Sequence, residues 1–375
     1  MKKVLYTATV LSHICQFHLP YIKMLKEKGY EVHVAAKNNL ADKNGLELKH
    51  ADKFIEIPFS RSPKSLQNLK ALKQLKKLLK EEYYDLIVCN TPMGGIITRM
   101  AAKKTRKKGT KVVYMAHGFH FYKGAPKKNW LVFYPIEKFM ARHTDVLITI
   151  NREDYALAKQ RLKISNIYHI NGIGVDFTRL QRDINREEER KQLGLTNTDF
   201  VLLSVGELNK NKNNIVVLQA LKELKNEKVK YLIAGNGPLE QELKRKVLEW
   251  GLTNQVQFLG YTRDLAKYMY SVDAFCFVSY REGLGLAAIE AMYCGLPILT
   301  SNKHGINDYS IEGETGYKCE PNDYLALAKA IDKLYKNPEQ CKNMGASNVR
   351  NAYKYEIKKI SNALMKIVED IICVE

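Results

Sequence analysis

Two glutamates lie close together in a glycine-containing segment of the second half of the chain, REGLGLAAIEAMYCGLPIL. The segment follows the strand-like run DAFCFVS, so we expect it at the carboxyl end of a strand, where open parallel sheets bind ligands. Gly285 lets backbone amides approach a ligand, and a helix beginning near Leu286 directs its positive end there. Glu282 precedes this helix and Glu290 lies within it. Their carboxylates suit ribose or sugar hydroxyls; the alternative is a capped helix with two solvated glutamates.

Histidines form a second set of candidate residues, in the first half of the chain. His117 and His120 follow the apolar run TKVVY, again at the expected end of a strand. A histidine there can donate to a sugar hydroxyl or to a developing negative charge. His13 and His18 follow the first expected strand, and together with His120 they are candidates for the side on which an acceptor substrate enters. For each of them a purely structural role is the alternative.

Two polar loops carry residues suited to binding phosphate. SVGELNKNKN contains Gly206, Lys210 and Lys212, and AGNGP contains Gly235 and Gly237. Lysine is a good point-charge ligand for phosphate, and glycine permits a close backbone approach. Taken without further context, each could be an ordinary loop between a strand and a helix.

Neither a metal centre nor a disulfide framework is expected. The seven cysteines are scattered, odd in number and never spaced as CxxC, which fits a reducing cytoplasm. No Asp-x-Asp occurs in the sequence, and the histidines have no ligand spacing. We therefore predict no cofactor and no metal, so that side chains and helix amides must supply any positive charge that the chemistry needs.

The elements that would position these residues are repeated in the two halves of the chain. Short apolar runs such as KVLYTATV and DLIVCN alternate with helical patterns, which is typical of βαβ units and a parallel sheet. The same alternation begins again near Phe200. A polar, charge-rich stretch indicates a linker between about Gly172 and Asn197. The 375 residues are therefore predicted to form an α/β protein with two Rossmann-like domains, at 1–175 and 190–350, and a C-terminal helix at 351–375 packed on the first.

The formal charge of +20 favours an anionic partner. In segment 65–80, leucines fall on one helical face and lysines crowd the rest, which is typical of a surface helix on a core or of a basic membrane-facing helix. Basic clusters recur at 103–111 and 123–135, the latter beside three aromatic side chains that would suit a lipid headgroup interface, Trp130, Phe133 and Tyr134. No apolar run approaches the roughly 18 residues of a membrane span. No groove-reading motif accompanies the lysines, so a nucleic-acid partner is not expected.

The sequence resembles the retaining glycosyltransferases of family 4, which share two glutamates separated by seven residues within a frame like EGxGLxxxEAMxxGxP. Glu282 and Glu290 match that motif. Four further segments follow in the family's order: SVGELNKNKN, AGNGPLEQEL, FLGYTRDL and EGETGYKCEPNDYLALAKAI. The first half, with HLPYIKMLKEKGYEVHVAA and AHGFHFYKGAP, looks like the subgroup that builds capsular, exopolysaccharide or lipid-linked oligosaccharide chains. The resemblance implies the GT-B fold, with two domains facing across a cleft.

The resemblance also implies residue roles. Glu290 would hold the ribose, Glu282 would contact the donor sugar, and His117 would contact that sugar near the reaction centre. The donor diphosphate would meet Gly206, Lys212 and the amides of Gly285 and Leu286, the base would lie near Tyr261 and Arg263, and the second glycine loop would line the same pocket. The family's phosphate-binding arginine is replaced here by Glu207, a reversal of charge. Lys210 could supply the missing charge, or Glu207 could pair with a lysine and hold it in place.

The expected reaction, by the same resemblance, transfers a hexose or N-acetylhexosamine from a UDP-sugar with retention to a polyprenyl-diphosphate-linked saccharide. The enzyme would work in the cytoplasm, peripherally on the inner face of the membrane, through the basic surface of its first domain. Two alternatives remain open: the same fold acting on a small soluble acceptor, and a non-catalytic nucleotide-sugar-binding partner protein, for which the charge reversal at Glu207 is the one indication.

Overall fold

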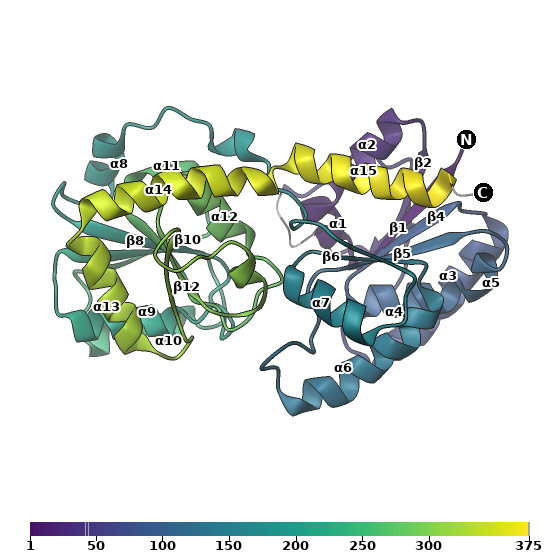
Figure 1. Cartoon of the computed structure of the whole chain (residues 1–375), viewed down its shortest axis with the longest axis horizontal. Coiled ribbons are helices and arrows are strands. Elements are labelled where there is room, and N and C mark those ends of the chain that lie inside the picture. The colour runs from purple at the N-terminus through teal and green to yellow at the C-terminus, as the bar shows by residue number, and fades with distance from the viewer. Residues whose placement is uncertain (42, 44, 374–375) are drawn as a thin grey trace. The chain divides into compact units, whose positions relative to one another are not determined.

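The computed structural model describes residues 1–41, 43 and 45–373, and it divides the chain into two compact units (Figure 1). The first unit contains Met1–Gly174 together with the chain from Ile357 onward, and the second contains Val175–Glu356. Each unit is built around a parallel sheet with helices packed on it. The predicted α/β class with two Rossmann-like halves is confirmed.

The sheet of the first unit has seven parallel strands in the order β3-β2-β1-β4-β5-β6-β7. Its central strands are buried because they read as continuous apolar runs, as expected for a sheet covered on both faces. The strand order reverses between β1 and β4, which pair in register from Val4 opposite Leu86. Ligands of such sheets bind outside the carboxyl ends of the strands at this switch point. The strands are β1 (Lys3–Val10), β2 (Glu31–Lys37), β3 (Lys53–Glu56), β4 (Leu86–Asn90), β5 (Lys111–Ala116), β6 (Val146–Thr149) and β7 (Asn166–His169).

The helices of the first unit connect these strands, and α15 returns from the end of the chain to pack beside α2 (Figure 1). Among the described residues, none of the helices combines the length and apolarity needed to cross a bilayer. The helices are α1 (Leu11–Phe17), α2 (Leu19–Glu27), α3 (Gln67–Glu81), α4 (Pro92–Ala101), α5 (Lys103–Arg106), α6 (Lys127–Met140), η1 (Ala141–His143), α7 (Arg152–Arg161) and α15 (Ile357–Cys373).

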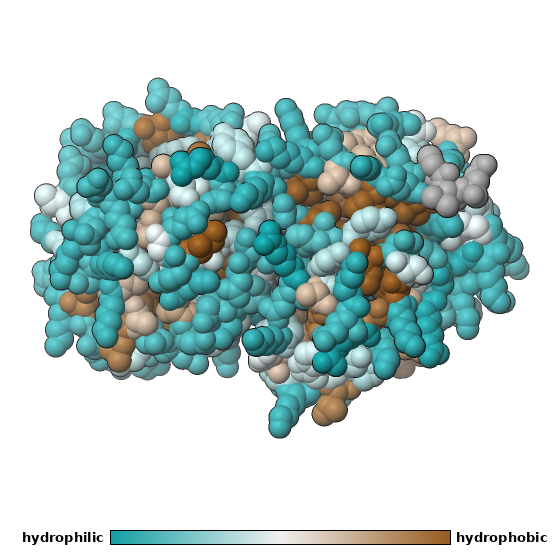
Figure 2. Space-filling view, in the orientation of Figure 1, coloured by the Kyte–Doolittle hydropathy of each residue, from teal (hydrophilic) through white to brown (hydrophobic). Residues whose placement is uncertain are grey.

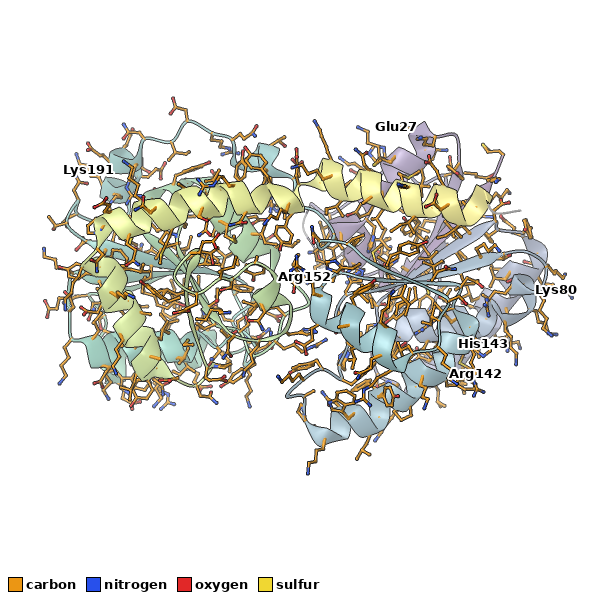
Figure 3. All side chains as sticks on the ribbon, in the orientation of Figure 1. Glu27, Lys80, Arg142, His143, Arg152 and Lys191 are labelled. Carbon is orange, nitrogen blue, oxygen red and sulfur yellow. The ribbon has the colours of Figure 1, made fainter. Side chains whose placement is uncertain are left out.

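Two surface features of this unit differ from the sequence expectation. Leu75 and Leu79 of α3 face the core, whereas Leu69 and the preceding Leu66 are 65% and 79% exposed, so the leucines do not share one buried face. Lys80 projects from the end of α3 into solvent (Figure 3). The aromatic side chains around α6 that were expected at a lipid interface pack against the core instead, and its exposed apolar side chains are Leu131, Val132 and Phe139.

The second unit has six parallel strands in the order β10-β9-β8-β11-β12-β13, with its own switch point between β8 and β11. Leu202 and Leu203 of β8 lie opposite Ala274 and Phe275 of β11. The strands are β8 (Phe200–Val205), β9 (Val229–Ala234), β10 (Val256–Gly260), β11 (Ala274–Phe277), β12 (Ile298–Ser301) and β13 (Gly316–Cys319). The helices are η2 (Phe177–Leu180), α8 (Arg186–Gln192), α9 (Asn214–Leu224), α10 (Glu240–Glu249), α11 (Leu265–Ser271), α12 (Leu286–Tyr293), η3 (His304–Asp308), α13 (Tyr324–Tyr335), α14 (Pro338–Ala352) and η4 (Tyr353–Tyr355).

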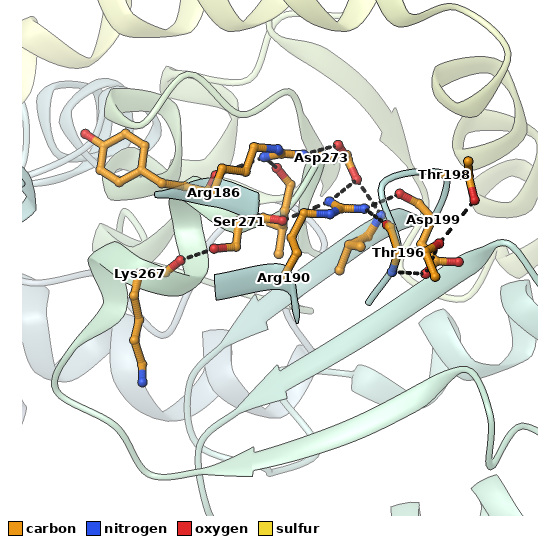
Figure 4. Close-up of polar contacts among 11 residues, drawn as sticks. Arg186, Arg190, Thr196, Thr198, Asp199, Lys267, Ser271 and Asp273 are labelled. Atoms are coloured by element: carbon orange, nitrogen blue, oxygen red, sulfur yellow. Dashed lines mark hydrogen bonds and ion pairs between the residues drawn. The ribbon is translucent and has the colours of Figure 1, made fainter. Parts of the chain in front are cut away.

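The stretch expected to be a linker is part of the second unit from Val175 onward. Arg186 and Arg190 of α8 both bind the carboxylate of Asp273, at 2.6 and 3.3 Å (Figure 4). The guanidinium of Arg190 is buried and also donates to three backbone carbonyls, those of Ser271, Thr196 and Asp199. The charge-rich composition predicted a solvated segment. In the structure, two of its positive charges, Arg186 and Arg190, are paired with Asp273 of the folded second unit.

The two ends of the second unit meet. The backbone N–H of Val175 donates to the carbonyl of Tyr355 at 2.8 Å, and Val175 forms a parallel bridge with Glu356. Just outside, in the first unit, Gly174 lies so close to Ile357 that an added Cβ would come within 2.6 Å of its side chain. The second unit is thus inserted into the first at a single place in the fold.

Candidate active site

The loops that follow the strands of the second unit gather around its switch point. Backbone hydrogen bonds tie neighbouring loops to one another: Leu208 N–H donates to Asn236 O, Gly235 N–H to Gly260 O, Tyr280 N–H to Asn211 O, and Gly305 N–H to Glu282 O. All the donor-side candidates except Glu290 lie in these loops or at the first turn of α12. The structure therefore brings together, at one edge of one sheet, the motifs that the sequence places across about 80 residues.

Lys212 and Glu282 form an ion pair at this edge. The ammonium Nζ lies 2.7 Å from Glu282 Oε1 and 4.6 Å from the centre of the Phe277 ring, so a cation–π contact also holds it. Asn211 donates its side-chain amide to Glu282 Oε1 at 3.3 Å. The residue predicted to bind diphosphate and the residue predicted to bind the donor sugar are thus in direct contact, beside the N-terminal end of α12 that begins after Gly285.

Glu290 is buried in the second turn of α12, and its carboxylate is in contact with the guanidinium of Arg179. Burial raises the pKa of Glu290, and the nearby Arg179 charge opposes that shift. Arg179 was not predicted, because it lies 111 residues away in the stretch taken as a linker. The carboxylate oxygens of Glu290 can accept hydrogen bonds, as contact with ribose hydroxyls would require.

The remaining donor-side candidates lie on exposed loops. Tyr261 and Arg263 follow β10 and are exposed at the same edge of the sheet. Glu207 and Lys210 are exposed in the loop after β8, where Glu207 accepts a hydrogen bond from Asn209 Nδ2 at 2.9 Å. The sequence left two explanations for the charge reversal at Glu207. The exposed position of Lys210 leaves it available to supply the missing positive charge, which is the first of them.

Gly235 and Gly237 must be glycine partly because a neighbouring loop packs closely against them. A Cβ on Gly235 would lie 1.9 Å from Gly206 O, and one on Gly237 would lie 2.4 Å from Leu208 O. The AGNGP motif predicted that the backbone comes close to a ligand. In the structure, the backbone of this motif comes close to the neighbouring loop, which begins at Gly206. These contacts fix the loop that carries Lys212.

We expect Gly235→Ala to weaken donor binding and to lower the free energy of unfolding by about 1–3 kcal/mol, because the loop after β8 must shift. Gly251→Ala is the control for a positive φ, +68° there against +142° at Gly235, because an added Cβ on Gly251 meets nothing within 4 Å. Urea unfolding and calorimetric titration with UDP would measure both effects. Equal losses in the two variants would show that backbone strain, rather than the loop contact, is responsible.

Three histidines of the first unit converge beyond the carboxyl ends of β1 and β5. His13 Nε2 lies 3.4 Å from both His117 Nε2 and His18 Nε2. His117 Nε2 also lies 3.2 Å from Asn90 Oδ1, which can only accept, so this contact assigns the proton of a neutral His117 to Nε2. His18 is fully buried behind its contact with His13, so the structure gives it no exposed surface to meet an acceptor directly. His120 lies elsewhere in the loop, with its ring 4.6 Å from that of Phe133.

The three converging rings are uncharged at neutral pH. Burial, followed by the charge of Arg61, lowers the pKa of His13 to about 4. Burial and the neighbouring histidines lower the pKa values of His18 and His117 well below their usual range. Neutral imidazoles can exchange a proton or a hydrogen bond with a hydroxyl substrate, and they can also bind a metal. The three Nε2 atoms lie within 4.8 Å of one another, and tetrahedral zinc would hold its nitrogen ligands about 3.4 Å apart.

The lowered pKa of His13 predicts a stability that depends on pH. The folded protein resists protonation that the unfolded chain accepts, so the stabilisation is complete above the ordinary histidine pKa near 6.5 and decreases as the pH falls toward about 4. We expect His13→Gln to flatten the fall in unfolding free energy between about pH 7 and about pH 5. The exposed His50, changed to Asn, is the control. An unchanged slope in His13→Gln would contradict the prediction.

Two Rossmann-like units, each with candidate residues at its own switch point, define the GT-B class of glycosyltransferase. Residues 3–151 match the family model described as glycosyl transferase 4-like, and residues 185–351 match the model described as glycosyl transferases group 1. The chain belongs to this glycosyltransferase family.

Relatives of similar length support the assignment. EpsD of Bacillus subtilis, which carries a provisional glycosyltransferase name, is 38% identical over 94% of this chain and 93% of its own. The Escherichia coli UDP-Gal:alpha-D-GlcNAc-diphosphoundecaprenol alpha-1,3-galactosyltransferase is 31% identical over 80% of this chain and 78% of that enzyme. The crystal structure of Anabaena HepE in complex with UDP has a TM-score of 0.81 at 20% identity, covering 99% of this chain and 100% of HepE, which shows the common fold.

Proposed function

We propose that the protein is a retaining glycosyltransferase that moves a hexose or N-acetylhexosamine from a UDP-sugar to a polyprenyl-diphosphate-linked saccharide in surface polysaccharide biosynthesis. The observation that carries the proposal is the Lys212–Glu282 pair, 2.7 Å apart, beside the N-terminal end of α12 at a switch point. The Lys212 ammonium and the backbone amides at the start of α12 suit a diphosphate, and the Glu282 carboxylate suits sugar hydroxyls. This combination is what binding a sugar joined to a diphosphate needs.

The leaving diphosphate would be stabilised without a metal ion in this proposal. Lys212 supplies a positive charge, and the amides at Gly285 and Leu286 supply aligned dipoles where charge develops. His117, uncharged and hydrogen-bonded to Asn90, would hold a hydroxyl of the donor sugar. Glu282 would hold another hydroxyl, and Glu290 the ribose.

Transfer is therefore expected to continue at an unchanged rate after dialysis against EDTA. Added Zn²⁺ is expected to inhibit, because the histidine group would bind it through Nε2 once the His117 proton moves to Nδ1, and His117 would then lose the N–H that faces Asn90. Initial rates with and without chelator, and with a series of Zn²⁺ concentrations, check both statements. Loss of activity in EDTA that Zn²⁺ or Mg²⁺ restores would overturn the metal-independent mechanism.

The acceptor part of the proposal is supported by two relatives whose names contain diphosphoundecaprenol or PP-undecaprenol. It is also supported by CapM of Staphylococcus aureus, which is named for capsular polysaccharide biosynthesis. A location on the inner face of the membrane is supported by the positive charge of the first unit. A basic hollow of about 360 Å³ near the end of α6, where Figure 3 shows Arg142 and His143, is lined by Lys103, Arg106, Lys107, Arg142, His143 and Asp145. Each lysine or arginine near an anionic bilayer contributes about 1 kcal/mol.

The donor is tested first by calorimetry with UDP-, GDP- and ADP-sugars on the wild type, Lys212→Ala and Glu290→Gln. We expect one nucleotide class to bind and both variants to weaken it. Transfer is then tested with the donor that binds and with undecaprenyl-diphosphate-linked saccharides, and NMR of the product reports the anomeric configuration. An inverted product would exclude retention. A folded protein that binds no nucleotide sugar would overturn the donor site, and one that binds the donor but transfers nothing would favour the non-catalytic alternative.

A further inference from the structure

A large apolar groove opens beside His13 in the first unit. Its volume is about 890 Å³, at the upper end of the roughly 300–1,000 Å³ common for ligand sites. The groove lies between α4 and α6, which pack on one another (Figure 1). It is lined by polar residues at the carboxyl ends of β1 and β4, and by apolar side chains along the two helices.

The two ends of the groove differ in character. The polar end contains His13 and the exposed Arg61, whose charge acts on His13, and His120 lines the groove against the ring of Phe133. From there Met93, Ile96 and Met100 of α4 follow one helical face for about 10 Å. The far end is open to solvent, since Met100 is 41% exposed.

α6 forms the other wall with Val132, Phe133, Ile136, Phe139 and Met140, which recur at helical spacing. Phe139 and Val132 are about half exposed at the rim, and Figure 2 shows hydrophobic side chains uncovered in the α6 region, at the lower edge of this view. The apolar lining therefore continues onto the outer surface.

A buried ion pair fixes the position of this wall. Arg99 of α4 binds Glu137 of α6 through two hydrogen bonds, at 2.9 and 3.0 Å, and its guanidinium stacks on Tyr114. Because both charges are buried, α6 cannot move away from α4 without exposing an unpaired charge to an apolar surrounding. The groove is thus a preformed site and not a gap between loosely packed helices.

We propose that this groove binds the first isoprene units of the acceptor's polyprenyl chain, with the acceptor diphosphate beside Arg61 at the polar end; this inference rests on the proposed function. A wall formed by one apolar stripe from each of two helices suits a single chain, whereas a phospholipid presents two. Arg61 complements a diphosphate, and the open far end lets the rest of the chain continue into a membrane.

The test compares two acceptors that carry the same saccharide in the same detergent, one on undecaprenyl diphosphate and one on a short water-soluble alkyl diphosphate. Ile136→Gln is expected to raise the KM for the undecaprenyl acceptor about tenfold and to leave the short acceptor unchanged. Leu131→Gln is the matched control, because Leu131 is on the same helix, 77% exposed and outside the groove. It should change neither KM. Equal effects of Ile136→Gln on both acceptors, or no effect on either, would overturn the inference.

A second measurement uses the unmodified protein without a sugar donor. Calorimetry should show that farnesyl diphosphate binds at least tenfold more tightly than inorganic diphosphate, and that Ile136→Gln removes this difference. Equally tight binding of a straight-chain dodecyl diphosphate would assign the groove to acyl chains and would overturn the proposal. If farnesyl diphosphate binds as expected but no acceptor is glycosylated, the proposed function fails and the lipid site stands.

Discussion

Lys212→Ala is expected to lower kcat by about 10²–10³, the usual effect of removing one preorganised group that stabilises developing negative charge. The Lys212 ammonium contacts Glu282 at 2.7 Å and the face of Phe277, so its position is set before a donor arrives. A diphosphate gains negative charge as the sugar leaves, and the loss should therefore appear in kcat more than in KM. Steady-state kinetics with the preferred nucleotide sugar would measure the two constants separately.

Two further variants make the Lys212 result specific. Lys228→Ala removes an exposed lysine directly before β9, at the opposite edge of the same sheet, and should change kcat by less than about threefold. Lys210→Ala reports whether the exposed lysine of the same loop replaces the arginine that Glu207 displaces. A kcat within threefold of the wild type for Lys212→Ala would remove this residue from the chemistry and leave it as a partner of Glu282.

Glu137→Ala is expected to lower the free energy of unfolding by about 3–5 kcal/mol, because it leaves the charge of Arg99 buried without a partner. Arg99 is completely buried and would retain only contacts with neutral groups, namely hydrogen bonds to Gly95 O and Thr144 Oγ1 and the ring of Tyr114. Urea unfolding followed by far-UV circular dichroism would measure the loss.

The double variant Arg99→Met with Glu137→Leu is the control for charge burial. It removes both charges at similar volume, so it should be close to the wild type in stability or above it. If Glu137→Ala and the double variant lose the same free energy, lost packing rather than an unpaired charge would explain the effect. A loss below about 1 kcal/mol for Glu137→Ala would show that α6 relaxes to hydrate Arg99.

Much of the fold is predictable from local pattern. Apolar runs of four to eight residues alternating with helical segments require parallel strands, and a strand's carboxyl end then follows directly from the chain direction. For that reason Glu282 and His117 could be placed at the edges of sheets from the residues before them. The same reasoning predicts that Lys212 and Glu282 lie at the same edge of one sheet only after the family's order of motifs has been recognised.

The features that were not predicted depend on contacts between distant segments. Arg179 reaches Glu290 from a stretch whose composition indicates a linker, and composition carries no information about which charge meets which. The histidine group joins residues 104 positions apart, so no ligand spacing reveals it. The core-facing orientation of Trp130 is set by packing on Tyr134 and Phe121 and not by the lysines beside it in the sequence.

The hydrogen bond between Val175 and Tyr355 has a consequence for how such enzymes diversify. Because the two ends of the second unit lie together in the fold, the whole of 175–356 can be exchanged as one module, and the first unit keeps its own strand order and its apolar groove. Under the proposed function, a chimaera made in this way would combine the donor specificity of one enzyme with the acceptor specificity of another. Helix α15 follows the second unit in the chain but belongs to the first. Any module inserted in place of 175–356 must therefore end where α15 begins.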